Sequence, residues 1–149
     1  MRAYVAGPYY TREQRDTQAR VAAVLESEGY STYLPQRDAP TLSDLVDACE
    51  HKLELFDKTY AAASKLALDS ALLHQSRCDI FVLTVTGSKA DAGPCAQAGM
   101  AFSAGIPVVL FDANSSNPLI DPMLLGLARG SVAHGLDQLK SLAHKSKGS

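Results

Sequence analysis

The feature that most constrains the fold is the alternation of short apolar runs with longer amphipathic segments. Five apolar runs are candidate strands: "RAYVAG" (2–7), "YSTYLP" (30–35), "CDIFVLTV" (78–85), "IPVVLF" (106–111) and "SVA" (131–133). Apolar strands separated by helices form parallel sheets that helices cover on both faces. The sequence therefore predicts one α/β domain over residues 1–149, with a doubly wound parallel sheet of about five strands.

Helical segments are expected between the strands. Thr11 can cap the first helix, with Gln14 at capping-box spacing, and Gly29 ends it. A long helical stretch covers 41–77, with its internal boundary near 58–63. The remaining helices are expected after "DAG" with Pro94 in the first turn, in "LIDPMLLGLA" (119–128) and in "GLDQLKSLAHK" (135–145).

The composition argues against nucleic acids and membranes as binding partners, and we therefore expect small-molecule ligands. The net charge of -2 and the pI near 6.0 argue against a nucleic-acid surface, which needs clustered Lys and Arg. No apolar run reaches membrane-spanning length, and "MRAYVAGPYY" leaves no room for a signal peptide. Cys49, Cys78 and Cys95 form no C-x-x-C pair, which favours reduced thiols and a cytoplasmic protein.

In doubly wound sheets, ligands bind beyond the carboxyl ends of the strands. Three loops are expected at that edge: "GPYY" (7–10), "PQRDAP" (35–40) and "TGSKADAG" (86–93). The first brings the backbone of Gly7 and Pro8 close to a ligand. Its Tyr9 and Tyr10 could sandwich a planar base, or could simply pack. The loop matches neither common phosphate-binding motif.

The third loop leads into an alanine-rich helix that carries Asp91, Gly93 and Gln97. Free N–H groups at a helix start attract hydroxyl oxygens and anions. Asp91 and Gln97 could therefore reach one small crevice. The alternative is that Asp91 only caps the helix and Gln97 lies on the surface. Cys95, between them, is either a small buried residue or a reactive thiol.

Other polar residues near this edge are ambiguous. Asp69, in "LALDSALL", faces either solvent or the crevice. Gln36 and Asp38 could contact a ligand or assist helix entry. The four histidines have no zinc-site spacing and no G-x-S-x-G elbow occurs, so we predict neither a metal centre nor a cofactor.

Together these segments resemble the nucleoside 2-deoxyribosyltransferases and their N-glycosidase relatives. The matching pieces are "YVAGPYY", "LPQRDA", "LALDSALLHQSRCDIFVL", "DAGPCAQAGMAFSAGIPVVLF" and "NPLIDPMLLGLA". The resemblance implies a flavodoxin-like fold and an enzyme that moves deoxyribose between nucleobases. In this family a glutamate attacks the anomeric carbon, and a second base or water then takes the sugar.

The resemblance also implies roles for particular residues. Asp91 matches the acid that binds sugar hydroxyls, and Asp69 matches, to within a residue or two, the acid in the helix before the third strand. The residues expected to contact substrate are Tyr4, Gly7, Pro8, Tyr9, Tyr10, Gln36, Asp38, Gly93, Asp121 and Met123. In the family, the segment matching Asp121 and Met123 reaches a neighbouring subunit, which implies a homo-oligomer with shared sites.

Gln97 occupies the position of the family's nucleophilic glutamate, and this is the main difference between this sequence and the family pattern. An amide is a poor nucleophile and cannot stabilise a cationic sugar carbon as a carboxylate can. Gln97 is then a substitution introduced to trap substrate, or the native residue of a nucleoside-binding sensor. As a third account, Asp91 supports a weaker hydrolysis through activated water. A plain flavodoxin-like interaction domain is the remaining alternative.

The loop "YYTREQRD" (9–16) bears on whether the ligand carries a phosphate. Thr11, Arg12 and Arg15 could face a phosphate or lie at a solvent-exposed helix start. The second arrangement favours a free nucleoside and a free nucleobase as the ligands.

Overall fold

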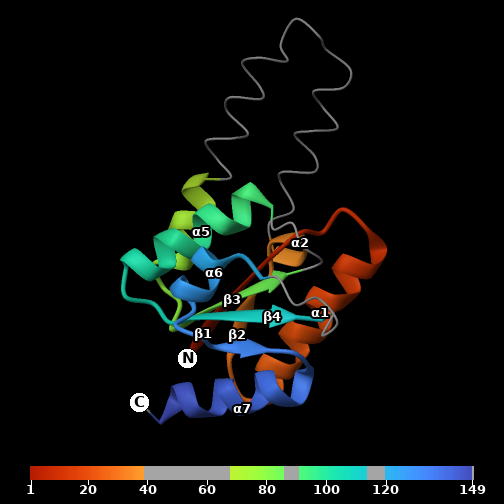
Figure 1. Ribbon diagram of the computed structural model, residues 1–149. Helices are drawn as coiled ribbons and strands as arrows, with labels where there is room; N and C mark the ends of the chain where they lie inside the picture. Colours follow the sequence, from red (N-terminus) through yellow and green to blue (C-terminus); the bar gives the residue numbers. More distant parts are fainter. Residues whose placement is uncertain (39–67, 86–90, 114–119, 149) are drawn as a thin grey trace, which may run out of the picture.

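The computed structural model describes residues 1–38, 68–85, 91–113 and 120–148. Its centre is a five-stranded parallel sheet in the order β2-β1-β3-β4-β5 (Figure 1). The strands are β1 (Arg2–Ala6), β2 (Ser31–Tyr33), β3 (Ile80–Val85), β4 (Val108–Asp112) and β5 (Val132–Ala133). This confirms the predicted doubly wound sheet.

Helices cover both faces of the sheet (Figure 1). One face packs against α1 (Arg12–Ser27) and α7 (Leu136–Lys147). The other face packs against α5 (Ala92–Ser103) and α6 (Pro122–Leu127), with the helical residues 68–75 beside α5. Each face therefore has its own apolar core.

Side chains alternate between these two cores along β1. Ala3 and Val5 face α1 and α7, whereas Tyr4 and Ala6 face α5. Tyr4 is thus the one large side chain that β1 places on the α5 face, and it is only 1% exposed. The alternation of side chains along β1 therefore buries the phenol of Tyr4 next to α5, the helix that carries Gln97.

The start of α1 forms as the sequence predicts. The Thr11 hydroxyl accepts a hydrogen bond from the Gln14 N–H at 3.1 Å, and Gln14 Oε1 accepts from the Thr11 N–H at 3.0 Å. This reciprocal pair is a capping box, which satisfies two backbone donors that a helix start leaves free. Gly29, with φ of 81°, ends the helix as expected.

The segment after β2 differs from the prediction. Residues Pro35–Asp38 form the short helix α2 and not a loop. Proline suits the first helical turn because its φ is already near the helical value and its missing N–H is not needed there. Of the helical stretch expected over 41–77, residues 68–75 are helical. The earlier part, including Cys49, lies outside the described residues.

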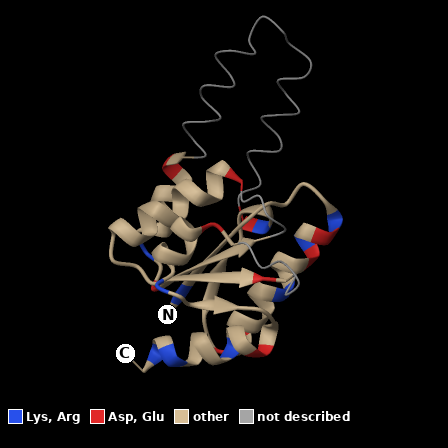
Figure 2. Ribbon diagram, in the orientation of Figure 1, with Lys and Arg blue, Asp and Glu red and all other residues tan. Residues whose placement is uncertain are grey.

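Charged residues are distributed over the outer helices. Along α1, Arg alternates with Asp and Glu, whereas α7 has one Asp at its start followed by Lys residues, and most of the central sheet is uncharged (Figure 2). Within the described part of the chain, no helix combines the length and apolar character that a bilayer crossing requires.

Candidate active site

The site predicted from sequence lies where two neighbouring strands send the chain to opposite faces. β1 and β3 pair directly, but β1 leads to α1 on one face and β3 leads to α5 on the other. A crevice forms beyond the strand ends at such a switch point. Residues 86–90 lie outside the described residues. The described segments expected to form its walls are the loop 7–11, the start of α5 and the helical residues 68–75.

Gly7 brings the loop backbone directly against β3. Its φ is 150°, and an added Cβ would lie 1.8 Å from Thr84 Oγ1 and 3.0 Å from the Thr84 carbonyl oxygen. No side chain fits there, so glycine is required by close approach as well as by conformation. The Thr84 hydroxyl donates to the Ala6 carbonyl at 3.1 Å, which ties the ends of β1 and β3 together.

The loop after Gly7 is held by donors from α1. Gln18 Nε2 donates to the Pro8 carbonyl at 2.7 Å. Arg15 Nη1 donates to the carbonyls of Tyr9 and Tyr10, at 3.1 and 3.0 Å. Side chains therefore bind three consecutive backbone carbonyls, and these bonds hold the loop in one position.

The two loop tyrosines do not form the sandwich that the sequence suggested as one possibility. Their rings stack on each other with centroids 5.9 Å apart and an interplanar angle of 20°. A base between two rings needs about 7 Å, twice the contact distance of carbon atoms. Tyr10 is 78% exposed, whereas Tyr9 is 38% exposed, and its pKa is raised by burial and by Tyr10 and Tyr33. Tyr9 is thus the more buried of the two rings.

Asp91 occupies the N-cap position of α5, yet its side chain makes no capping hydrogen bond. An aspartate that served only as a cap would accept from the second or third backbone N–H of the helix. The cap-only interpretation is therefore not supported. Gly93 is exposed, and no atom of the described residues lies within 4 Å of where its Cβ would be. The described residues therefore leave room beside the first turn of α5.

Gln97 lies half-buried on α5, beside the phenol of Tyr4. Burial and the neighbouring Tyr33 raise the pKa of Tyr4 well above its usual range, although the hydrogen-bonding influence of the Gln97 amide lowers it. The phenol consequently stays neutral. The backbone carbonyl of Gln97 also accepts from Gln75 Nε2 at 2.7 Å.

An aromatic column supports this arrangement. The Tyr4 ring lies between Phe81 and Tyr33, with centroid distances of 5.4 and 5.1 Å. Tyr33 stacks on His74 at 3.9 Å, and its hydroxyl lies 3.2 Å from Ser70 Oγ. We define Tyr4, Tyr33, Gln75 and Gln97 as the residue-97 cluster. It joins β1, β2, α5 and the helical residues 68–75.

Asp69 lies on the same side of the sheet as Gln97, because the helical residues 68–75 contact α5 through Gln75. Its side chain is exposed, whereas the next residue, Ser70, is half-buried and reaches Tyr33. Of the two positions, Ser70 is the one that points toward the residue-97 cluster.

Asp121 lies near the start of α5. The pKa of the Cys95 thiol is raised by burial and then by Asp121 and Asp91, so this thiol is held protonated and packs as a small apolar residue. Asp121 caps α6 by accepting from the Met123 N–H at 2.7 Å. Met123 is 76% exposed.

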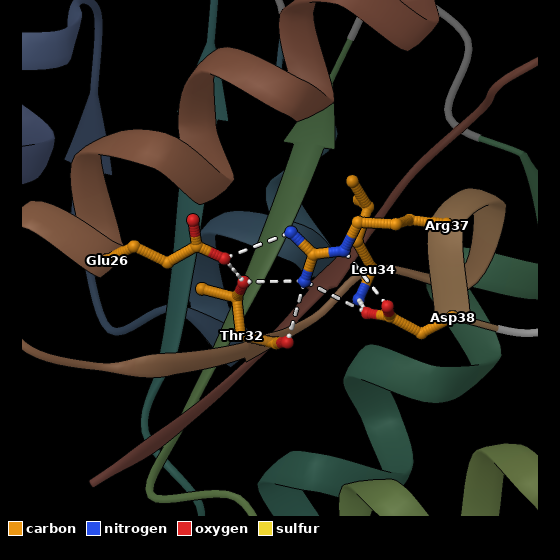
Figure 3. A network of polar contacts seen from close by, with 5 residues as sticks. All are labelled: Glu26, Thr32, Leu34, Arg37 and Asp38. Atoms are coloured by element: carbon orange, nitrogen blue, oxygen red, sulfur yellow. Dashed lines mark hydrogen bonds and ion pairs between the residues drawn. The ribbon is translucent and has the colours of Figure 1, made fainter.

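Gln36 and Asp38 are engaged in contacts within the chain. Gln36 Nε2 donates to the Arg15 carbonyl at 3.0 Å. Asp38 accepts from Arg37 at 2.9 and 3.0 Å and from the Leu34 N–H at 2.8 Å (Figure 3). These bonds favour assistance to helix entry over ligand contact, the two roles that the sequence left open.

The sequence did not single out four residues that contact or belong to these segments: Gln18, Tyr33, Ser70 and Gln75. Gln18 had a usable signal, because it falls on the buried stripe of α1 with Val21, Ala22 and Leu25. Gln75 had no such signal, because its partner is a backbone carbonyl 22 residues away in sequence.

The sequence model of the family described as nucleoside 2-deoxyribosyltransferase matches residues 3–137. The chain belongs to this family.

Solved structures share the fold. The 2-deoxyribosyltransferase from Bacillus psychrosaccharolyticus is 19% identical, with a TM-score of 0.67, over 94% of this chain and 90% of that one. A conserved protein from Enterococcus faecalis V583 is 20% identical, with a TM-score of 0.76, over 97% and 98%. No curated protein sequence matches the chain significantly. The family match and the shared fold support deoxyribosyltransferase-type activity.

Proposed function

We propose that the crevice binds a 2′-deoxynucleoside and that its chemistry is cleavage of the N-glycosidic bond with transfer of the deoxyribosyl group to a second base. Asp91 binds the sugar hydroxyls, Tyr9 lies against the base, and residue 97 faces the anomeric carbon. With Gln97 in that position, the native chain is a strong binder and a slow catalyst.

The observation that carries this proposal is the state of Asp91. It stands at the N-terminus of a 12-residue helix without capping it. Its carboxylate is thus available to accept hydrogen bonds from a ligand, and the open space beside Gly93 gives a sugar room to approach. The positive end of α5 adds further attraction for hydroxyl oxygens.

Gln97 explains why we expect slow chemistry. In the transfer step a carboxylate forms a bond to the anomeric carbon while the bond to the leaving base breaks. The base departs with the electron pair and takes up a proton, and the acceptor base later reverses the sequence. An amide attacks poorly, and the neutral phenol of Tyr4 supplies no negative charge in its place. The presence of Gln97 where a carboxylate is expected also favours a second candidate, a nucleoside sensor without catalysis.

The contacts of the loop 9–16 support a nucleoside over a nucleotide. Thr11 is used in the capping box. Arg12 pairs with Asp16 at 3.8 Å on the exposed side of α1, and Arg15 donates to loop carbonyls. Each group that the sequence offered to a phosphate therefore has another partner.

We also propose that α6 completes the site of a second copy of the chain. Met123 is an apolar residue of α6, yet it is 76% exposed. It follows two residues after Asp121, which lies near the start of α5. Sedimentation at micromolar concentration should show an oligomer. Full nucleoside affinity in a monomer would contradict the shared site.

The substitution Gln97→Glu tests the proposed reaction. We expect base exchange between 2′-deoxyinosine and adenine, or thymidine and cytosine, to rise by about 10²–10⁴-fold, because the carboxylate both attacks and stabilises the cationic transition state. Products are separated chromatographically. Gln138→Glu on α7 adds the same charge away from the crevice and should leave exchange unchanged.

Other outcomes of this assay are also informative. If no donor gives a gain, residue 97 is not the nucleophile position and the sensor function replaces the transferase. If the native chain releases free base without an acceptor, and Asp91→Asn abolishes this release, Asp91 activates water for hydrolysis.

A further inference from the structure

Two buried glutamines make matching contacts on opposite faces of the sheet. Gln18 belongs to α1 and is 1% exposed, and Gln75 ends the helical residues 68–75 and is 3% exposed. Each donates its amide N–H to a backbone carbonyl of a crevice wall at 2.7 Å: Gln18 to Pro8 and Gln75 to Gln97. Each glutamine therefore holds one wall.

The same two side chains are incompletely satisfied. Among the described residues, neither Gln18 Oε1 nor Gln75 Oε1 has a hydrogen-bond partner, and both atoms are buried. A buried carbonyl oxygen without a partner destabilises the folded state, a cost that an apolar side chain of similar size would avoid. Natural proteins concentrate such departures at functional sites.

The two acceptors explain what the contacts can do. Pro8 has no N–H, so its carbonyl is the only backbone group through which the loop can be held at that residue. Gln97 lies inside α5, and a bond to its carbonyl from a neighbouring helix fixes how α5 is rotated about its axis. That rotation sets the direction in which the Gln97 side chain points.

We propose that Gln18 and Gln75 are positioning residues of the nucleoside site. Gln18 fixes the loop that lies against the base, and Gln75 fixes residue 97 toward the anomeric carbon. This inference rests on the proposed function. The proposal predicts different effects for substitutions of Gln18 and of Gln75. The loop that lies against the base contributes to affinity, whereas the orientation of residue 97 contributes to turnover.

The test uses Gln18→Met and Gln75→Met, which keep side-chain volume and remove the amide. Each is made in the native chain and in the Gln97→Glu background, with Leu25→Met, a buried residue of α1 away from the crevice, as the packing control. Three quantities are measured: Tm, steady-state exchange between 2′-deoxyinosine and adenine, and amide hydrogen exchange of peptides spanning residues 7–14 and 92–103. Leu replaces Met wherever a Met variant does not fold.

We expect Tm to stay within about 3 °C of the parent for both variants, because each loses one hydrogen bond and one unsatisfied oxygen together. In the Gln97→Glu background, Gln18→Met should raise KM about tenfold with kcat within threefold. Gln75→Met should lower kcat about tenfold with KM within threefold. Hydrogen exchange should speed up in the 7–14 peptide for Gln18→Met and in the 92–103 peptide for Gln75→Met.

Three results would overturn the inference. They are kinetics and hydrogen exchange that match the Leu25→Met control, a fall in Tm of more than about 10 °C with kcat and KM changing together, or the two effects exchanged between the variants. If the Gln97→Glu parent itself shows no turnover, the proposed function fails. Hydrogen exchange then decides the positioning role alone, since local loosening of the named peptide supports it and unchanged exchange rejects it.

Discussion

Two polar clusters of this protein differ in charge, in burial and in how completely their hydrogen-bonding groups are paired. We call Glu26, Thr32, Arg37 and Asp38 the Arg37 cluster (Figure 3). It lies at the surface, with the Arg37 side chain 46% exposed. All three guanidinium nitrogens donate, with partners on Glu26, Asp38 and Thr32 at 2.9–3.0 Å. The Thr32 hydroxyl also donates to Glu26. The residue-97 cluster, in contrast, is largely buried and leaves Gln75 Oε1 without a partner among the described residues.

This difference suggests that the Arg37 cluster serves stability and the residue-97 cluster serves function. The Arg37 cluster joins α1, β2 and α2 through bonds from all three guanidinium nitrogens, so its loss should lower stability and leave the crevice intact. In the residue-97 cluster the neutral phenol of Tyr4, the amide of Gln97 and the incompletely bonded Gln75 contribute little net stability. Substitutions of Gln75 and Gln97, unlike those of the buried Tyr4 ring, should change binding or turnover more than they change the free energy of unfolding.

The largest expected effect tests whether the crevice also contains residues that are needed for folding. Gly7→Ala should lower the free energy of unfolding by at least about 3 kcal/mol, because the new Cβ would lie 1.8 Å from Thr84 Oγ1 at a φ of 150°. Denaturant unfolding measures the change. Thr84→Ala in the same chain should recover part of the loss by removing that oxygen. A loss below about 1 kcal/mol for Gly7→Ala would show that the loop is not held against β3.

The next effect compares two helix starts. Asp91→Asn should weaken 2′-deoxynucleoside binding by about 10- to 30-fold, since the carboxylate accepts from the sugar, and it should leave Tm nearly unchanged because Asp91 makes no cap bond. Thr11→Ala, which removes a working capping box, should lower stability by about 1 kcal/mol. Calorimetric titration and thermal unfolding of both variants measure the contrast. A Tm loss for Asp91→Asn equal to that of Thr11→Ala would restore the cap-only interpretation.

The smallest effect belongs to the Arg37 cluster. Arg37→Ala should lower stability by about 1 kcal/mol at pH 7, with nucleoside affinity unchanged, because its partners are half-exposed and the pairing is screened by solvent. Denaturant unfolding and titration with ligand measure both quantities. A loss of affinity without a loss of stability would remove the distinction between the two clusters.

The same variant has a defined pH dependence. The Thr32 hydroxyl and Arg37 lower the pKa of Glu26, and burial of Asp38 is outweighed by its bonds to Arg37 and Leu34, so that its pKa is also lowered. A carboxyl group with a lowered folded pKa stabilises the protein above its unfolded value, near 4, and loses this contribution as pH falls through the folded value. The stability difference between the native chain and Arg37→Ala should therefore be full at pH 7 and shrink below about pH 4.

The fold could be predicted because its determinants are local. Apolar runs define the strands, and the Thr11 and Gln14 pair with Gly29 defines both ends of α1. The short helix α2 was missed because Pro35 suits a turn as well as a first helical residue.

The sequence could predict which residues the sheet brings to one edge, but not the bonds that they make there. The order of the strands places Gly7, Asp91 and Gln97 at one edge. The carbonyl that Gln75 contacts depends on packing between segments distant in sequence. Capping by Asp91 and stacking of Tyr9 on Tyr10 depend on side-chain conformations that the residue types do not fix.

The most direct test of the nucleoside site is a titration of the native, isotope-labelled chain with 2′-deoxyinosine and with thymidine, followed by backbone NMR. Our account predicts saturable shift changes for at least one ligand, concentrated at residues 7–11 and 91–97, with the Arg37 cluster and α7 unaffected. Absence of binding at millimolar ligand, or shift changes confined to α7 or the Arg37 cluster, would contradict the assignment of this crevice as a deoxynucleoside site.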